Sequence, residues 1–213
     1  FMNKNELIKP DYECNRCPRL RSFILENRVK EPSWHNGPVN SFGDLKGRLL
    51  IVGLAPGLKG ANRTGRPFTG DYAGDLLFST LLKFGLARGS YKKHVGDSLI
   101  LNNCRITNAV RCLPPENKPN GAEVKSCSPF LISELETMKN LKVLLALGGL
   151  AHGAILTVLE KRKSMFKFSH NALHDLNNVV LANSYHCSRY NTNTGRLTEK
   201  IFREVFISLT KIM

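Results

Sequence analysis

The chain has 213 residues, of which 42% are hydrophobic and 23% are charged. These proportions are typical of a globular domain and exclude a disordered or low-complexity protein. Lys and Arg outnumber Asp and Glu by 31 to 17, giving a net charge of +14. That excess favours a polyanionic partner such as nucleic acid over a protein that is basic for no functional reason.

The length fits one domain, which we expect to span residues 1–213. The longest apolar run, Val143 to Leu147 with its flanking glycines, is far shorter than the roughly 20 residues that a membrane span needs. The first ten residues are polar, unlike a secretory signal. We therefore expect a cytoplasmic protein that binds no membrane.

Short apolar runs rich in β-branched residues predict four buried strands, at 49–53, 105–110, 142–147 and 179–183. Apolar residues at helical spacing predict four helices, over 72–87, 121–139, 150–160 and 197–211. Strands that alternate with helices indicate an α/β fold of three layers, with a central, mostly parallel four-stranded sheet flanked by helices. Ligands bind such sheets beyond the carboxyl ends of the strands.

The first loop at a strand end covers residues 53–71, GLAPGLKGANRTGRPFTGD. Its glycines let the backbone approach a ligand closely, and Phe68 offers an aromatic face. Asp71 stands just before a predicted helix, where it suits an N-cap and also an electrostatic or general-base role. Backbone N–H donors and the helix dipole would keep its carboxylate ionised. Asp75, one turn further on, is the alternative carboxylate. The loop has no GKS or GKT and is not a nucleotide-binding P-loop.

Two further strand ends carry polar residues. Asn108 lies near the end of the second predicted strand and Asn117 lies in the loop that follows it, at 111–119. Each presents a donor and an acceptor, as the edge of a nucleobase requires; turn or cap asparagines are the alternative. The third loop, HCSRYNTNTGRLT at 186–198, combines hydroxyls, amides and two guanidiniums, which suit phosphate contacts. We assign a function to His186 because it would share a cleft with Asp71.

Six cysteines in a cytosolic protein are not expected to form disulfides. Cys14 and Cys17 form a CxxC pair, and Cys112 and Cys127 form a second, wider pair. If the pairs converge, four thiolates suit a tetrahedral zinc ion or an iron–sulfur cluster, and spacing does not separate the two. Unconnected thiols are the alternative, and we interpret the remaining two cysteines as small buried side chains.

The motifs together resemble those of the uracil-DNA glycosylase superfamily, most closely its family 5. The matching segments are GLAPG at 53–57, GANRTGRPFTGD at 60–71, ITNAVRCLPPENKP at 106–119 and HCSRYNTNTGRLT at 186–198. Two departures stand out. Leu54 occupies a position that is acidic in families with a polar first motif, as is usual in family 5, and Cys187 replaces the usual proline after the histidine.

The resemblance implies an enzyme that hydrolyses the N-glycosidic bond of uracil, with hypoxanthine or xanthine as further substrates, and leaves an abasic site. It acts as a monomer on DNA that contains deaminated bases, and flips the target base out of the stack. The resemblance also implies a structural 4Fe-4S cluster that ties down the N-terminal segment. Its ligands would be Cys14, Cys17, Cys112 and Cys127.

The implied roles fall into three groups. Asp71 stabilises the sugar cation and orients water, His186 stabilises the leaving base, and Asn117 helps to place the water or the base. The residues expected to bind the base are Gly53, Leu54, Ala55, Pro56, Gly57, Phe68 and Asn108. Those expected to hold DNA are Ser188, Arg189, Asn191 and Arg196.

Two other functions fit parts of the sequence. A non-catalytic nucleic-acid-binding module with a structural metal explains the charge and the cysteines but leaves Asp71 and His186 without a role. An electron-transfer protein explains a cluster but not the basic surface. The glycosylase interpretation requires that the three loops wall a single pocket.

Overall fold

The computed structural model describes residues 6–213, and residues 1–5 of the predicted domain lie outside this range. The helices and turns of 3-10 type are α1 (Pro18–Lys30), α2 (Ala61–Thr64), α3 (Tyr72–Lys83), η1 (Pro115–Asn117), α4 (Gly121–Thr137), α5 (Gly149–Val158), η2 (Lys163–Met165), α6 (Arg189–Asn193) and α7 (Glu199–Thr210). The strands are β1 (Phe42–Gly43), β2 (Leu49–Gly53), β3 (Ala87–Arg88), β4 (Ile100–Leu101), β5 (Cys104–Asn108), β6 (Val143–Leu147), β7 (Leu173–Asp175) and β8 (Val180–Ser184).

Within residues 6–213, the main sheet has the order β1-β5-β2-β6-β8-β7. Its four central strands are the four predicted ones, and all of them run parallel. The mostly parallel sheet is therefore confirmed, but it has six strands rather than four, because β1 and β7 add antiparallel edges. These edge strands have two and three residues and are only partly buried, so they lack the apolar run that would predict them.

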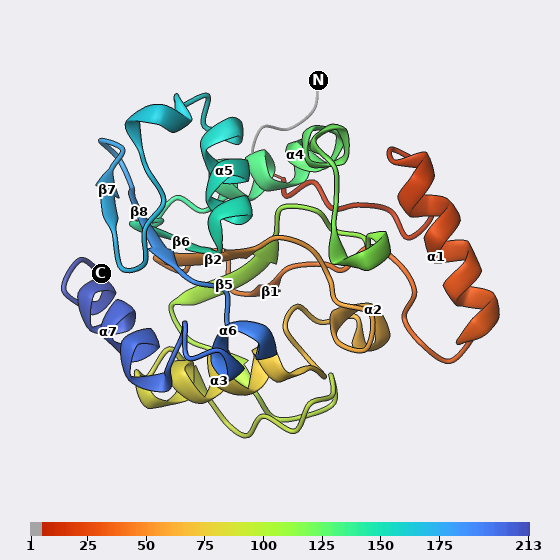
Figure 1. Cartoon of the computed structure of the whole chain (residues 1–213), viewed down its shortest axis with the longest axis horizontal. Helices are drawn as coiled ribbons and strands as arrows, with labels where there is room; N and C mark the ends of the chain where they lie inside the picture. Colours follow the sequence, from red (N-terminus) through yellow and green to blue (C-terminus); the bar gives the residue numbers. More distant parts are fainter. Residues whose placement is uncertain (1–5) are drawn as a thin grey trace.

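The sheet lies between two layers of helices, as Figure 1 shows. Side chains that alternate along β2 explain this arrangement: Leu49 and Ile51 belong to the core under α3 and α7, whereas Leu50 and Val52 belong to the core under α4 and α5. Because both faces of the central strands are covered, every residue of β2 is buried. This is the reason that the strand is apolar throughout rather than alternating.

The predicted helices are all present, with ends that differ by at most four residues. Helix α3 ends at Lys83 rather than at 87, because Gly85 takes a left-handed conformation with φ of +70°. Helix α1 was not predicted. Its buried side chains are Leu20, Ile24 and Asn27, which leave only a weak apolar pattern.

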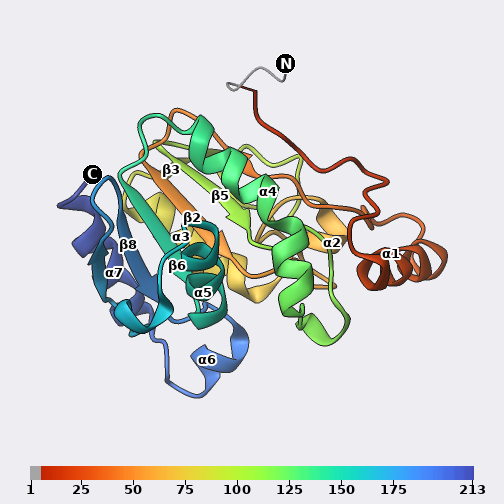
Figure 2. The same cartoon turned by 90° about the horizontal axis from the view of Figure 1, so that it is seen from above.

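The carboxyl ends of β5, β2, β6 and β8 share one edge of the sheet, since the four strands are parallel and in register. Figure 2 shows α5 and α6 near this edge. The three polar loops of the sequence leave the sheet there. None of the helices described is long and apolar enough to cross a bilayer.

Candidate active site

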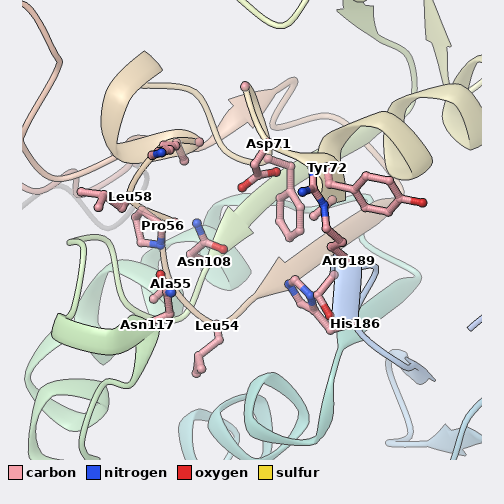
Figure 3. A pocket seen from close by; sticks show the side chains of 18 of the residues that line it. Leu54, Ala55, Pro56, Leu58, Asp71, Tyr72, Asn108, Asn117, His186 and Arg189 are labelled. Carbon is pink, nitrogen blue, oxygen red and sulfur yellow. The ribbon is translucent and has the colours of Figure 1, made fainter. Parts of the chain in front are cut away.

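A pocket of about 830 Å³ opens at the carboxyl edge of the sheet and takes residues from all three polar loops. The loop after β2 contributes residues 54–61, 68 and 70–73. The end of β5 and the second loop contribute Asn108 and Asn117, and the third loop contributes His186, Ser188 and Arg189. Figure 3 shows Asp71, Asn108 and His186 gathered around the same space. The convergence that the glycosylase interpretation requires is therefore present.

Main-chain hydrogen bonds hold the first and second loops together at the base of the pocket. The N–H of Ala109 donates to the carbonyl of Gly53, and that of Val110 donates to the carbonyl of Leu54, both over 2.9 Å. Gly53 lies behind the pocket wall rather than in it: a Cβ there would come within 2.3 Å of the Asn108 Oδ1 and 2.7 Å of the Phe68 ring. Its contribution is the space that lets those two side chains approach.

Asp71 is the N-cap of α3, and its Oδ1 accepts a hydrogen bond of 3.3 Å from the Gly74 N–H. The carboxylate packs on the backbone of Gly60, where a Cβ would lie only 2.2 Å from Oδ2. Burial raises the pKa of Asp71, while the N–H groups of Gly74 and Ala73 act in the opposite direction and the charge of Asp75 adds to the increase. The sequence indicates the capping donors, which lower the pKa of Asp71, but not the desolvation, which is the larger effect.

Phe68 and His186 both line the pocket, and their rings stack on each other with centroids 5.9 Å apart and planes 30° apart. Phe68 has a left-handed backbone with φ of +54°, which is costly for an aromatic residue and requires support from its surroundings. Tyr91 provides this support: its hydroxyl donates to the Phe68 carbonyl over 3.4 Å and accepts from the Gly70 N–H over 3.2 Å.

His186 is neutral at neutral pH, because burial lowers its pKa to about 4. Its carbonyl accepts a hydrogen bond of 2.8 Å from the side-chain amide of Asn191. A neutral imidazole can donate one N–H to an acceptor in the pocket without the cost of burying a full charge.

The third loop divides into residues inside and outside the pocket. Ser188 caps α6 and Arg189 places its guanidinium 5.5 Å from the centre of the Tyr72 ring, and both line the pocket. Asn191 and Arg196 are not among the lining residues: Asn191 holds the His186 backbone, and Arg196 lies 4.4 Å over the Tyr185 ring.

The four cysteines of the two pairs line a second, small cavity of about 10 Å³ between α1 and α4. Burial raises the pKa of Cys17, Cys112 and Cys127, and neighbouring thiols of the set add to each increase. The Arg111 N–H donates to the Cys127 sulfur over 3.3 Å. Across residues 6–213, no group of three or more His, Cys, Asp or Glu side chains is arranged to hold a metal ion.

Sequence reasoning missed several residues of the pocket, including Leu58, Tyr72 and Lys93. Tyr72 follows Asp71 directly, so its position next to a candidate site residue could have indicated that it lines the pocket. Lys93 and the supporting Tyr91 come from the loop between β3 and β4, whose sequence carries no motif. Only the folded chain brings that loop to the pocket.

The comparisons with known proteins agree with this geometry. The model of the uracil DNA glycosylase superfamily matches residues 40–210. The chain belongs to this superfamily. A type-5 uracil-DNA glycosylase of Thermus thermophilus is 40% identical over 99% of both chains, and one of Pyrobaculum aerophilum is 40% identical over 90% of this chain and 85% of that relative. A type-4 enzyme of the same Pyrobaculum species is 32% identical over 74% of this chain and 65% of its own.

Within the superfamily the chain falls into family 5, since several type-5 relatives match it over nearly its whole length at about 40% identity. The superfamily match covers all the loops that line the pocket and includes Cys112 and Cys127. It begins after Cys14 and Cys17, which only the longer matches to individual relatives span.

Proposed function

We propose that the protein excises uracil from DNA by hydrolysing the bond between the base and deoxyribose, leaving an abasic site. The observation that carries this proposal is the presence of the Asp71 carboxylate and the His186 imidazole in one pocket with the Phe68 ring. A pocket of about 830 Å³ lies in the range of small-ligand sites and accommodates a single extruded nucleotide. The names of the type-5 relatives support the same reaction.

Asp71 acts on the sugar. As the C1′–N bond breaks, its electron pair leaves with the base, and positive charge develops on the sugar. A carboxylate that is already stripped of water gains more from a nearby cation than a solvated one does. Asp71 also orients the water whose oxygen forms the new bond to C1′ and whose proton is then released, and Asn117, which also lines the pocket, helps to place it.

His186 acts on the leaving base. The departing base carries negative charge on its oxygens, and the neutral imidazole donates its N–H to one of them. Phe68 stacks on the base, and Asn108 with the backbone of 54–57 binds its polar edge. Leu54 leaves the first motif without a carboxylate, which supports a tolerance for hypoxanthine and xanthine beside uracil.

DNA is the partner, held outside the pocket by the basic third loop. Ser188 and Arg189 stand at the pocket and Asn191 and Arg196 further along the same loop, where cations and amides suit phosphate contacts. The net charge of +14 supports the same partner. We propose that the protein acts on DNA as a monomer and in the cytoplasm.

We extend the proposal to the four cysteines, which all line one cavity. Four thiolates suit either a zinc ion or a 4Fe-4S cluster, and the resemblance of the motifs to family 5 favours the cluster. Cys14, Cys17, Cys112 and Cys127 would hold the cluster, which would fasten α1 to α4 as a structural element.

The test uses a double-stranded oligonucleotide with one uracil, incubated with the protein and then treated with alkali to cleave abasic sites. We expect strand breaks at the uracil position, and none with the matching cytosine duplex. Duplexes with hypoxanthine and xanthine test the wider base range. Binding of the DNA without any strand break would favour the non-catalytic module instead.

A further inference from the structure

The loop between β3 and β4 forms part of the rim of the pocket. It runs below α3 in Figure 1, and its anchor is Asp97, whose carboxylate is fully buried. Asp97 accepts two hydrogen bonds from Arg66, at 2.7 and 2.8 Å, and two more from the N–H groups of Lys92 and Leu99. The hydrogen bonds from Arg66 lower the pKa of Asp97 to about 2. The anchor therefore stays ionised and holds the loop at neutral pH.

This anchored loop carries Lys93 to the pocket. Lys93 lines the cavity, and so does Asp75, one helical turn after Asp71. The Lys93 ammonium and the Asp75 carboxylate form an ion pair of 2.8 Å, with side chains 56% and 37% exposed. The pair is therefore open to solvent at the rim. Lys92 and His94 on either side are exposed as well.

The ion pair leaves Lys93 with unused binding capacity. An ammonium group has three N–H donors, and the pair with Asp75 occupies one. Among the described residues that line the pocket, the cations are Lys59, Lys93 and Arg189, and the carboxylates are Asp71 and Asp75. When a nucleotide enters with its sugar at Asp71, its two flanking phosphates remain at the rim, where Asp75 repels them. A cation next to Asp75 would offset this repulsion and bind the phosphate through a charge-assisted hydrogen bond.

We infer that Lys93 binds a DNA phosphate next to the extruded nucleotide, so that the loop between β3 and β4 is a second DNA-binding loop. This loop binds the DNA strand at the α3 side of the pocket, while Arg189 and the rest of the third loop bind the strand at the α6 side. The inference rests on the proposed function, because it assumes that a nucleotide of DNA enters the pocket. The competing explanation is that Lys93 only neutralises Asp75.

The experiment measures binding to a duplex that contains a stable abasic-site analogue, over a series of salt concentrations. The variants are Lys93→Ala, Asp75→Asn and the double variant. Lys46→Ala is the matched control, because Lys46 is an exposed lysine in the turn before β2, at the opposite end of the strands from the pocket. Thermal melting checks that each variant folds.

One lost phosphate contact lowers the slope of log affinity against log salt by about 0.9. We expect this decrease for Lys93→Ala and for the double variant, and no change for Lys46→Ala. A double variant with the wild-type slope would show that Lys93 only offsets Asp75 and would overturn the inference. An unchanged slope in Lys93→Ala would overturn it as well.

Failure of the proposed function looks different. If binding by the wild-type protein does not depend on salt and no strand is broken at uracil, both the proposed glycosylase function and the role of Lys93 are wrong. If the wild-type protein produces strand breaks at uracil but the Lys93→Ala variant keeps the wild-type salt slope, only the proposed role of Lys93 in DNA binding is wrong.

Discussion

The pocket and the cysteine site both bury ionisable groups, and burial favours the uncharged form in each, but the groups and their proposed roles differ. In the pocket, desolvation raises the pKa of Asp71 and lowers that of His186 to about 4. In the proposed mechanism, the desolvated carboxylate of Asp71 stabilises a sugar cation and the neutral imidazole of His186 donates to the leaving base. In the cysteine site, desolvation raises the pKa of Cys127 to about 11, so the proposed cluster would have to displace the proton of this thiol.

The two sites also differ in the elements that build them. The pocket is built from strand ends fixed by the main sheet. The cysteine site joins α1, which lies outside the sheet layers in Figure 2, to α4. Arg19 and Glu123 make an ion pair of 2.7 Å between the same two helices.

The largest effect is expected at the cysteines. Cys112→Ser should abolish iron binding, because a serine hydroxyl is a poor ligand for a soft metal site. Iron and sulfide content and the visible absorbance of the purified protein measure this. Cys104→Ser is the matched control, since Cys104 is buried in the main core away from the set. Equal loss of iron in both variants would contradict the assignment of the four ligands.

Asp71→Asn should lower the rate of uracil excision by about 10³-fold, because it removes the charge that stabilises the sugar cation. Asparagine caps a helix as well as aspartate does, and it removes a desolvated charge. We therefore expect the melting temperature to stay the same or rise. Single-turnover kinetics and thermal melting measure the two effects.

Asp75→Asn tests which of the two carboxylates is essential. Asp75 is paired with Lys93 at the rim and faces solvent more than Asp71 does, so its loss should change excision at saturating enzyme far less. If Asp75→Asn loses activity while Asp71→Asn keeps it, the roles of the two carboxylates are reversed.

His186→Ala should lower the excision rate by about 10²-fold, the usual consequence of removing one donor to a developing oxyanion. Binding to DNA with an abasic analogue should change little, since the base is absent from that ligand. His170→Ala is the control: His170 stacks on Tyr185 outside the pocket. A similar loss in both variants would indicate a general structural effect.

The dependence of excision on pH is the smallest effect expected. The raised pKa of Asp71 means that its carboxylate takes up a proton at a higher pH than a free aspartate does. Activity should therefore fall on acidification with an apparent pKa above the usual value near 3.9. His186 does not titrate until about pH 4, so Asp71→Asn should give a flat profile from pH 5 to 8. A step near 6.5 in that variant would show a titrating His186.

The sequence by itself determined the parts of the molecule whose signals are local. The apolar runs at 49–53 and 142–147 define central strands, because a strand covered on both faces has to be apolar throughout. The long motifs at 60–71 and 186–198 identify the family, and their place at strand ends puts them at one edge of the sheet.

Only the tertiary structure decided which groups are desolvated and which distant segments meet. Desolvation outweighs the capping bonds at Asp71 because the backbone of Gly60 and the rest of the pocket cover it, and no local pattern encodes that cover. The edge strands β1 and β7, the support of Phe68 by Tyr91 and the arrival of Lys93 at the rim all depend on long-range packing. Their residues are ordinary in sequence, and the fold alone gives them partners.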